Sequence, residues 1–206
     1  MNETKKHIIL ITSKLFLQKN FKEVTLSEIV KETGLSKGAF YHYFQSKEQL
    51  FLEVVDYFFQ SFTRNYENYS QESLQQFYTD YMNETLSLFI NYQDNFRENS
   101  GHEINKLNFT VNYFSLMFDA LKLLPEFRDK AMLGFDTEIN HWAKAIESAR
   151  KRGEIKKSLS NKEIAEIFMY LSDGIAMHMI FRGADMNTMI NLIKNLWDTF
   201  YNLIKT

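Results

Sequence analysis

The chain has 206 residues, of which 45% are apolar and 16% aromatic. A chain of this length buries roughly 70% of the surface that its unfolded form exposes, so a sizeable hydrophobic core can form. It contains no cysteine, which excludes a disulfide framework and fits the cytosol. One proline and seven glycines are few for this length, and because strands need frequent turns, the composition favours long helices.

The net charge of −2 conceals an asymmetry along the chain. Residues 1–50 contain eight lysines and five acidic residues, a balance of +3, and this leaves 16 basic and 21 acidic residues, a balance of −5, for residues 51–206. A basic N-terminal part on an acidic body suggests that the N-terminal part meets polyanions. The chain shows no uninterrupted apolar stretch that could span a bilayer, so we expect no membrane partner.

The first predicted helix covers residues 4–19, where apolar residues recur at helical spacing. Asn20 follows it, a residue type that tolerates the left-handed conformation of a helix end. The next segment, Thr25-Leu26-Ser27-Glu28, has the pattern of a capping box, in which the threonine hydroxyl caps the helix and the glutamate reaches back to the backbone. This second helix is predicted to end at Gly34.

A third helix is predicted over residues 37–44, with Ser36 as its cap. A second box, Ser46-Lys47-Glu48-Gln49, opens a fourth helix over residues 47–66. Two short helices joined by a tight turn that contains glycine form a helix-turn-helix, here at about residues 25–44.

Helical spacing sorts the side chains of the third helix into two faces. Phe40 and Phe44 are four residues apart and share an inward face, while Lys37 and Tyr41 share the opposite face. Lys47 lies at the start of the next helix, whose free N–H groups add positive potential. An ordinary solvated surface would explain single lysines, but the ordered set suits contact with the phosphates of DNA and insertion of a helix into the major groove.

The segment "LF…NF…VTLSEIVKETGLSKGAFYHYFQSKEQLF" resembles the DNA-binding domain of the tetracycline-repressor (TetR/AcrR) family of bacterial regulators, over residues 8–53. One departure is Asn20, where the family commonly has glycine. The resemblance implies that the second helix and the third helix, which is the recognition helix of this family, meet a double-stranded DNA operator with an inverted repeat. The DNA contacts that it implies are Thr25, Ser27, Ser36, Lys37, Gly38, Ala39, Tyr41, His42 and Lys47.

The remaining three quarters of the chain keep a helical pattern. A polar stretch near Gly101 interrupts it, and Pro125 suits the first turn of a further helix. That helix closes on Arg150-Lys151-Arg152-Gly153, so the three cations are better explained as a helix terminus than as a second nucleic-acid patch. Helices are predicted over residues 71–91, 104–123, from about 125 to 152, from Ser160 to Gly183, and at about 187–204.

The helix that begins at Ser160 carries two apolar stripes, which suggests close packing on two sides. In the resembled family the last two helices pair with their copies in a homodimer. The alternative is that one subunit fills both stripes, but a single helix-turn-helix reads too few bases and this favours the dimer. One stripe holds Ile164, Phe168, Leu171, Ile175 and Met179, and the other Ala165, Met169, Ser172, Ala176 and Ile180.

The body of the chain has no recognisable catalytic or metal-binding pattern. Its five histidines are scattered, and the pair Glu138 and His141 is more often part of a solvated helix face than of a site. We therefore expect no enzyme activity, no catalytic residue, no metal and no cofactor. The aromatic residues and methionines of residues 74–181 fit a pocket for a small apolar or aromatic ligand, although core packing explains them as well. The polar-tipped candidates for such a pocket are Tyr113, His141, Trp142 and His178.

The sequence thus predicts an all-α protein with an N-terminal three-helix helix-turn-helix DNA-binding domain, residues 1–48, and a C-terminal helical ligand-binding and dimerisation domain, residues 49–206. The resemblance implies a transcriptional repressor that a small ligand releases from its operator, in the bacterial cytoplasm and at the nucleoid when bound to the operator. Two alternatives are a DNA-binding dimer controlled by a protein partner, or one that activates without a small ligand. An enzyme fused to a DNA-binding head is disfavoured by the missing catalytic residues.

Overall fold

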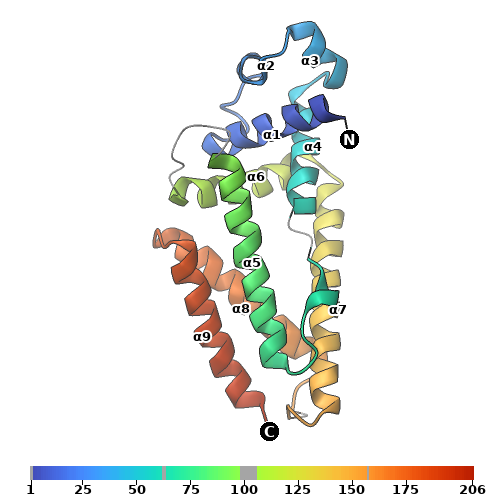
Figure 1. Ribbon diagram of the computed structural model, residues 1–206, viewed down its shortest axis with the longest axis vertical. Coiled ribbons are helices and arrows are strands. Elements are labelled where there is room, and N and C mark those ends of the chain that lie inside the picture. Colours follow the sequence, from blue (N-terminus) through green and yellow to red (C-terminus); the bar gives the residue numbers. More distant parts are fainter. Residues whose placement is uncertain (1, 62–63, 98–105, 157) are drawn as a thin grey trace. The chain divides into compact units, whose positions relative to one another are not determined.

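The computed structural model describes residues 2–61, 64–97, 106–156 and 158–206, which form an all-helical fold (Figure 1). The only β-type pairing in these residues is an isolated bridge between Ile155 and Lys205. The prediction of an all-α protein is therefore confirmed. The α-helices are α1 (Glu3–Gln18), α2 (Leu26–Thr33), α3 (Lys37–Tyr43), α4 (Lys47–Ser61), α5 (Leu74–Arg97), α6 (Lys106–Leu123), α7 (Phe127–Lys151), α8 (Asn161–Phe181) and α9 (Met186–Ile204), with the 3-10 helix η1 (Tyr66–Asn68) before α5.

The chain divides into two compact units. Unit 1 comprises Met1–Thr63 and Asn95–Arg128, and unit 2 comprises Arg64–Asp94 and Asp129–Thr206. Unit 1 thus groups α4 and α6 with the three N-terminal helices, while α5 and α7 contribute most of their length to unit 2 beside α8 and α9. The predicted domain boundary at residue 48 stays a prediction, but the packing places the helix that follows it with the N-terminal helices.

Side-chain caps fix where several helices begin. The Thr25 hydroxyl accepts a hydrogen bond from the backbone N–H of Glu28 at 3.2 Å, and the Ser36 hydroxyl accepts one from Ala39 at 3.2 Å. At Ser160 both halves of the predicted box are present, because Glu163 also accepts from the Ser160 N–H at 2.7 Å. These bonds satisfy backbone donors that the first turn of a helix leaves free.

Two details differ from the predicted pattern, and a third cannot be compared. Asn20 is not left-handed, since no described residue other than glycine has a positive φ. Its side-chain oxygen instead accepts from the N–H groups of Lys22 at 3.0 Å and Glu23 at 3.1 Å, and this closes the turn without an unusual backbone. The carboxylate of Glu28 pairs with Lys19 of the preceding helix region. The predicted break near Gly101 lies outside the described residues.

Three helix boundaries were also predicted wrongly, the first being the end of α5, which runs to Arg97 and not to residue 91. α4 ends at Ser61, and Arg64 and Asn65 lie outside any helix, so the fourth helix is shorter than the predicted 47–66. Pro125 lies before α7, in a turn that the bond from the Phe127 N–H to the Leu124 carbonyl closes at 3.0 Å. Its fixed φ suits the second position of such a turn as well as it suits a first helical turn.

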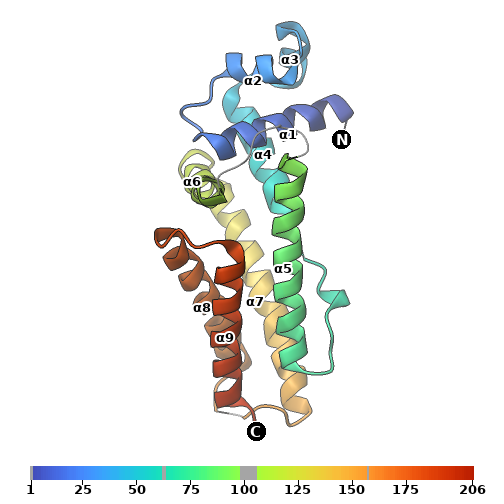
Figure 2. The same cartoon turned by 60° about the vertical axis from the view of Figure 1, so that its left-hand side comes forward.

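An aromatic cluster joins the helices of unit 1. The Phe16 ring lies 5.6 Å from Phe21 and 5.5 Å from Phe51, and Phe21 lies 4.5 Å from Phe51. This cluster joins α1, the turn after it and α4, and α1 also packs against α2 and α6. In the two ribbon views α2 and α3 lie next to each other on the same side of α1 (Figures 1 and 2).

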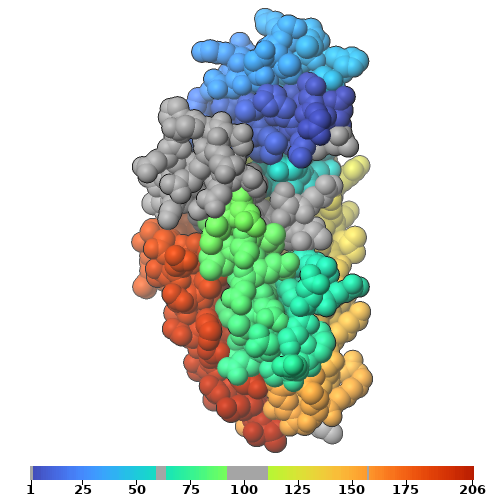
Figure 3. Space-filling model, in the orientation of Figure 1, coloured from blue at the N-terminus to red at the C-terminus, as the bar shows by residue number. Residues whose placement is uncertain are grey.

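A second aromatic core fills unit 2. Trp142 of α7 and Trp197 of α9 are both fully buried, with ring centroids 5.0 Å apart, and Trp197 donates its indole N–H to the Phe168 carbonyl at 2.9 Å. The Tyr78 hydroxyl of α5 binds Asp198 of α9, and these two helices run side by side on the face seen in Figure 3. The core therefore connects every long helix of the unit.

Most of the two predicted stripes of α8 face the interior of unit 2. Ile164, Phe168 and Ile175 of the first stripe belong to the buried core, as do Ala165 and Met169 of the second. A different line of side chains on α8 is exposed instead: Ile167 at 37%, Tyr170 at 60%, Met177 at 38% and Phe181 at 83%. Most residues of both stripes are therefore buried within one subunit, which is the alternative that the sequence left open.

α8 also differs from the expectation that no segment could span a membrane. Within the described residues it is the one helix whose length and apolar composition would suit a span, with a mean hydropathy of 1.3. Composition alone is weak evidence, because the core helix of a soluble protein has the same character. Ile164, Phe168 and Ile175 pack in the core of unit 2, which accounts for much of this apolar content.

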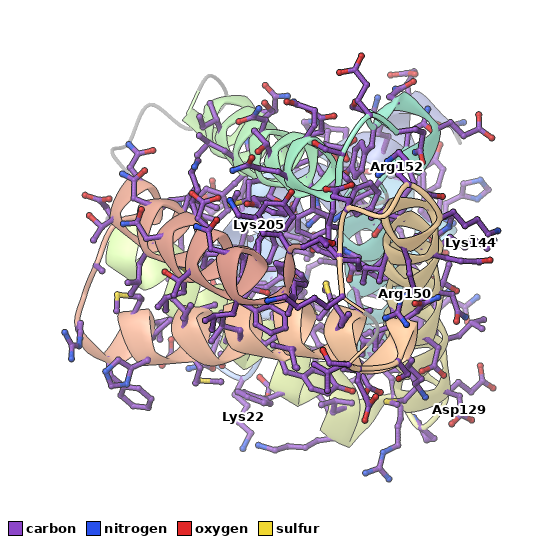
Figure 4. The ribbon with its side chains drawn as sticks, turned by 90° about the horizontal axis from the view of Figure 1, so that it is seen from below. Lys22, Asp129, Lys144, Arg150, Arg152 and Lys205 are labelled. Atoms are coloured by element: carbon purple, nitrogen blue, oxygen red, sulfur yellow. The ribbon has the colours of Figure 1, made fainter. Side chains whose placement is uncertain are left out.

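The three cations at the end of α7 are engaged within the protein, as predicted for a helix terminus. Arg150 donates to the Leu159 carbonyl, Lys151 pairs with Glu147 at 2.6 Å and Arg152 with Glu154 at 2.8 Å. Figure 4 shows Arg150 and Arg152 at this end of the helix. Gly153 follows with a φ of 74°, the left-handed conformation that glycine adopts without strain.

Replacing Ser160 by alanine should destabilise the protein by about 1 kcal/mol, because the cap of α8 is lost. Urea unfolding followed by circular dichroism measures the change. Ser158→Ala is the control, because this exposed serine lies outside the capping box. Equal stability of the two variants would show that the cap contributes nothing.

Candidate functional site

The outward face of α3 carries the predicted DNA-contacting side chains. Phe40 and Phe44 are completely buried, whereas Lys37, Gly38 and His42 are exposed and Tyr41 is 45% exposed. The predicted division of this helix into two faces is therefore confirmed. Burial of the two phenylalanines points the cation, the phenol and the imidazole away from the core of unit 1, where they are free to meet a partner.

The predicted DNA contacts at the starts of α2 and α3 differ in their exposure and in their hydrogen bonds. Thr25, Ser27 and Ser36 are exposed, but the hydroxyls of Thr25 and Ser36 already accept the capping bonds of α2 and α3. A hydroxyl that accepts one bond can still donate its own proton to a phosphate oxygen. Ala39 is half-buried. Whether any of these residues contacts DNA stays a prediction.

Lys47 has an internal partner that the sequence did not reveal. Its ammonium group donates to the Val24 carbonyl at 2.6 Å and lies 4.2 Å from the centroid of the Phe21 ring. Burial lowers the pKa of Lys47, an effect that the neighbouring Glu48 opposes. An ammonium group has three donors, so one bond to Val24 leaves others for a phosphate. Lys47 thus holds the start of α4 against the segment before α2.

Further polar contacts hold the helix-turn-helix on α1. Lys5 pairs with Glu53 of α4 at 2.7 Å, and a ring nitrogen of His7 lies 3.2 Å from the Thr33 carbonyl at the end of α2. The Lys19–Glu28 pair joins the end of α1 to the start of α2, and Lys19 lowers the pKa of Glu28. Exposed pairs of this kind add little stability one by one, but together they restrict the angle between the helices.

The four predicted ligand contacts do not form one cluster within either unit. Tyr113 belongs to unit 1, where its ring lies 6.2 Å from Phe58. His178 of α8 is exposed and accepts a hydrogen bond from Arg182 at 3.1 Å. His141 and Trp142 are adjacent on α7, but their side chains have different surroundings. Trp142 is buried in the core, and its indole N–H has no hydrogen-bond partner among the described residues.

His141 borders a cavity of about 200 Å³ in unit 2. Its ring stacks on Tyr66 at 4.2 Å with an angle of 3° between the planes. The cavity is smaller than the roughly 300–1,000 Å³ typical of sites for drug-sized ligands. Its lining residues are Tyr66, Gln71, Phe77, His141, Lys144, Ala145 and Ser148.

A polar cluster beside this cavity was missed by the sequence reasoning. One oxygen of Glu138 accepts from Arg64 at 3.1 Å, from the Tyr66 hydroxyl at 3.1 Å and from the Tyr81 hydroxyl at 2.8 Å. The spacing between Glu138 and His141 suggested a solvated helix face, and this interpretation is wrong for Glu138. The signal that could have found the cluster is a lone arginine near the end of a predicted helix, followed by closely spaced tyrosines, but its partner lies 74 residues away along the chain.

The cluster keeps its hydroxyls neutral. Burial and the Glu138 carboxylate raise the pKa of Tyr66 and of Tyr81, so both act as hydrogen-bond donors throughout the neutral range. Burial and then Glu138 also raise the pKa of Asp173. In the described part of the chain, no group of three or more His, Cys, Asp or Glu side chains is arranged to hold a metal ion.

The geometry of α2 and α3, with buried apolar faces and exposed polar faces, defines a helix-turn-helix protein of the DNA-binding class. Residues 8–54 match the model of the family described as bacterial regulatory proteins, tetR family. Residues 8–54 thus form a DNA-binding domain of the TetR family of regulators. This is a family without enzyme activity, which agrees with the prediction that the chain is not an enzyme.

Two relatives illustrate how the similarity is distributed. The chain is 48% identical over 58 residues to the uncharacterized HTH-type transcriptional regulator YerO of Bacillus subtilis, covering 28% of this chain and 20% of YerO. It is 36% identical over 55 residues to the HTH-type transcriptional repressor NemR of Escherichia coli, covering 27% of this chain and 28% of NemR. These alignments thus span less than a third of the relatives' length.

The fold likeness extends over the whole chain. A TetR transcription regulator from Haloarcula marismortui superposes with a TM-score of 0.71 at 13% identity, covering 100% of both chains. The reduced form of E. coli NemR superposes with a TM-score of 0.65 at 19% identity, covering 100% of this chain and 98% of that one. At these identities the likeness establishes the fold of the C-terminal helices and not their ligand.

Replacing Lys47 by methionine should lower the stability of the protein by about 1 kcal/mol, because the Val24 carbonyl loses its charged donor while the aliphatic contact with Phe21 remains. Urea unfolding measures the change. Lys37→Met is the control, because Lys37 is exposed on α3. If the two variants are equally stable, the Lys47–Val24 bond does not hold the start of α4.

Proposed function

We propose that the protein is a transcriptional repressor that binds a DNA operator as a homodimer in the bacterial cytoplasm and that a small ligand releases it. The observation that carries the DNA-binding part is the exposed set Lys37, Gly38, Tyr41 and His42 on a helix whose other face is buried. The match of residues 8–54 to the TetR family supports the same function. Lys37 and Tyr41 contact phosphates, and the recognition helix reads bases in the major groove.

Dimerisation follows from the geometry of reading DNA. A seven-residue helix reaches few bases, and two recognition helices about 34 Å apart enter successive major grooves on one face of the duplex. We assign the dimer contact to the last two helices. α8 has an exposed apolar line of Ile167, Tyr170, Met177 and Phe181, and α9 has Leu203 exposed at 69%. Apolar patches of this kind mark protein–protein contacts.

A groove along α8 adds to this surface. It has a volume of about 350 Å³ and is lined by Leu159, Glu163, Glu166, Ile167 and Tyr170. Gly174 lies on the same line of the helix, and a methyl group added at this glycine would meet no described atom within 4 Å. The groove and Gly174 leave room on this face of α8, which suits close approach of a helix from a second copy.

Binding to DNA selected from a random pool tests the DNA contacts. Lys37→Ala should weaken binding to the selected sequence and to random DNA alike, because a phosphate contact carries no sequence information. The slope of log affinity against log salt should fall by about 0.9 for each lost contact, and hence by about 1.8 in a dimer. Lys22→Ala is the control, since Lys22 is an exposed lysine off the recognition helix. An unchanged slope would remove Lys37 from the interface.

The double variant Tyr170→Glu, Phe181→Glu should be a soluble monomer, because four carboxylates cannot be buried together in a symmetric interface. Sedimentation equilibrium measures the mass. Leu133→Glu is the control, since this leucine is 68% exposed but lies on α7. A double variant that remains a dimer would show that the exposed line of α8 is not the interface.

A further inference from the structure

Arg64 occupies a cation-binding site within its own chain. Its guanidinium carbon lies 4.0 Å from the centroid of the Tyr81 ring, and its Nε bonds to Glu138 at 3.1 Å. A cation over an aromatic face, with a carboxylate beside it, is the arrangement that proteins use to bind planar organic cations. We call the Glu138 carboxylate, the Tyr81 ring and the Tyr66 hydroxyl the Arg64 site.

Negative charge around the Arg64 site exceeds the charge of Arg64. Glu138 and Glu84 are both hydrogen-bonded to tyrosine hydroxyls of this cluster, the latter to Tyr69. Asp173 interacts electrostatically with Glu138. Glu138 pairs with Arg64, Glu84 bonds to a neighbouring tyrosine, and Asp173 acts on Glu138 from an exposed position, so the cluster favours cations over anions.

The fit of Arg64 in this site is incomplete. Its side chain is only 13% exposed, yet its Nη1 atom is buried without a hydrogen-bond partner among the described residues. A buried guanidinium donor without an acceptor weakens the hold of the site on its occupant. A free cation that satisfies its donors better can therefore compete with Arg64.

Space for a larger ligand lies next to the site. Tyr66 donates its hydroxyl to Glu138, while its ring borders the cavity of about 200 Å³ together with His141 and Phe77. The cavity and the Arg64 site thus share the Tyr66 side chain. A ligand that places a cationic fork at Glu138 can extend an aromatic body along these stacked rings.

We propose that the Arg64 site binds planar aromatic amidinium or guanidinium cations, which displace Arg64 from Glu138 and from the Tyr81 ring. The proposal rests on the proposed function, since it names the chemical class of the ligand that releases the repressor. Arg64 follows the last residue of α4, Ser61, by three positions along the chain. Displacement removes the ion pair that fastens the segment after α4, and α4 begins beside the helix-turn-helix.

Benzamidine and benzamide provide the test, because they share a shape and differ in charge. Arg64→Ala removes the internal competitor, so we expect it to bind benzamidine about tenfold more tightly than the wild-type protein does, while benzamide binding stays unchanged. Titration calorimetry measures both. The added change Glu138→Gln should abolish the gain. Arg182→Ala is the control, since this exposed arginine bonds to His178 outside the cluster.

A gain for benzamidine that benzamide shares, or no gain at all, would overturn the proposal. If Arg64→Ala does not fold, thermal shifts of the wild-type protein and of Glu138→Gln decide: benzamidine must stabilise the former more than benzamide does, and the difference must vanish in the latter. DNA binding is measured separately with the selected sequence. Failure to bind any DNA would refute the proposed function, whereas intact DNA binding that benzamidine does not weaken would refute only the assignment of the ligand class.

Discussion

Burial of Phe40 and Phe44 determines the direction in which α3 faces, and the proposed function depends on that direction. A helix of seven residues is too short to persist by itself in water, so its orientation comes from packing and not from helix propensity. Both phenylalanines are fully buried, and the residues between and beside them are therefore held outward. The aromatic cluster of Phe16, Phe21 and Phe51 then fixes α1 and α4 beneath this arrangement.

The polar contacts of unit 1 add angular restraint to this apolar core. Lys47 bonds to the Val24 carbonyl, so the start of α4 and the segment leading into α2 are joined directly. The Lys5–Glu53 pair makes a second connection from α1 to α4. These two contacts tie α4 to α1 and to the segment before α2, an arrangement that suits a connecting helix in the proposed release from DNA.

Unit 2 combines a continuous aromatic core with one buried polar cluster. Trp142, Trp197 and Phe168 are in mutual contact, which gives the unit a rigid interior. Arg64 and Glu138 are the exception, an ion pair held mainly by tyrosine hydroxyls and an aromatic face. A buried pair contributes less net stability than apolar side chains of the same volume, so its presence here suggests a role other than stability.

The local pattern of the sequence determined the helices, their caps and the division of α3 into two faces. Ser36, Ser160 and Gly34 act as predicted because a cap depends only on residues within a few positions of it. Only the tertiary structure decided that both predicted stripes of α8 are mostly buried, where Lys47 directs its ammonium group and that Glu138 meets Arg64. These contacts join residues that are between 23 and 74 positions apart along the chain, and helical periodicity contains no information about pairs at such distances.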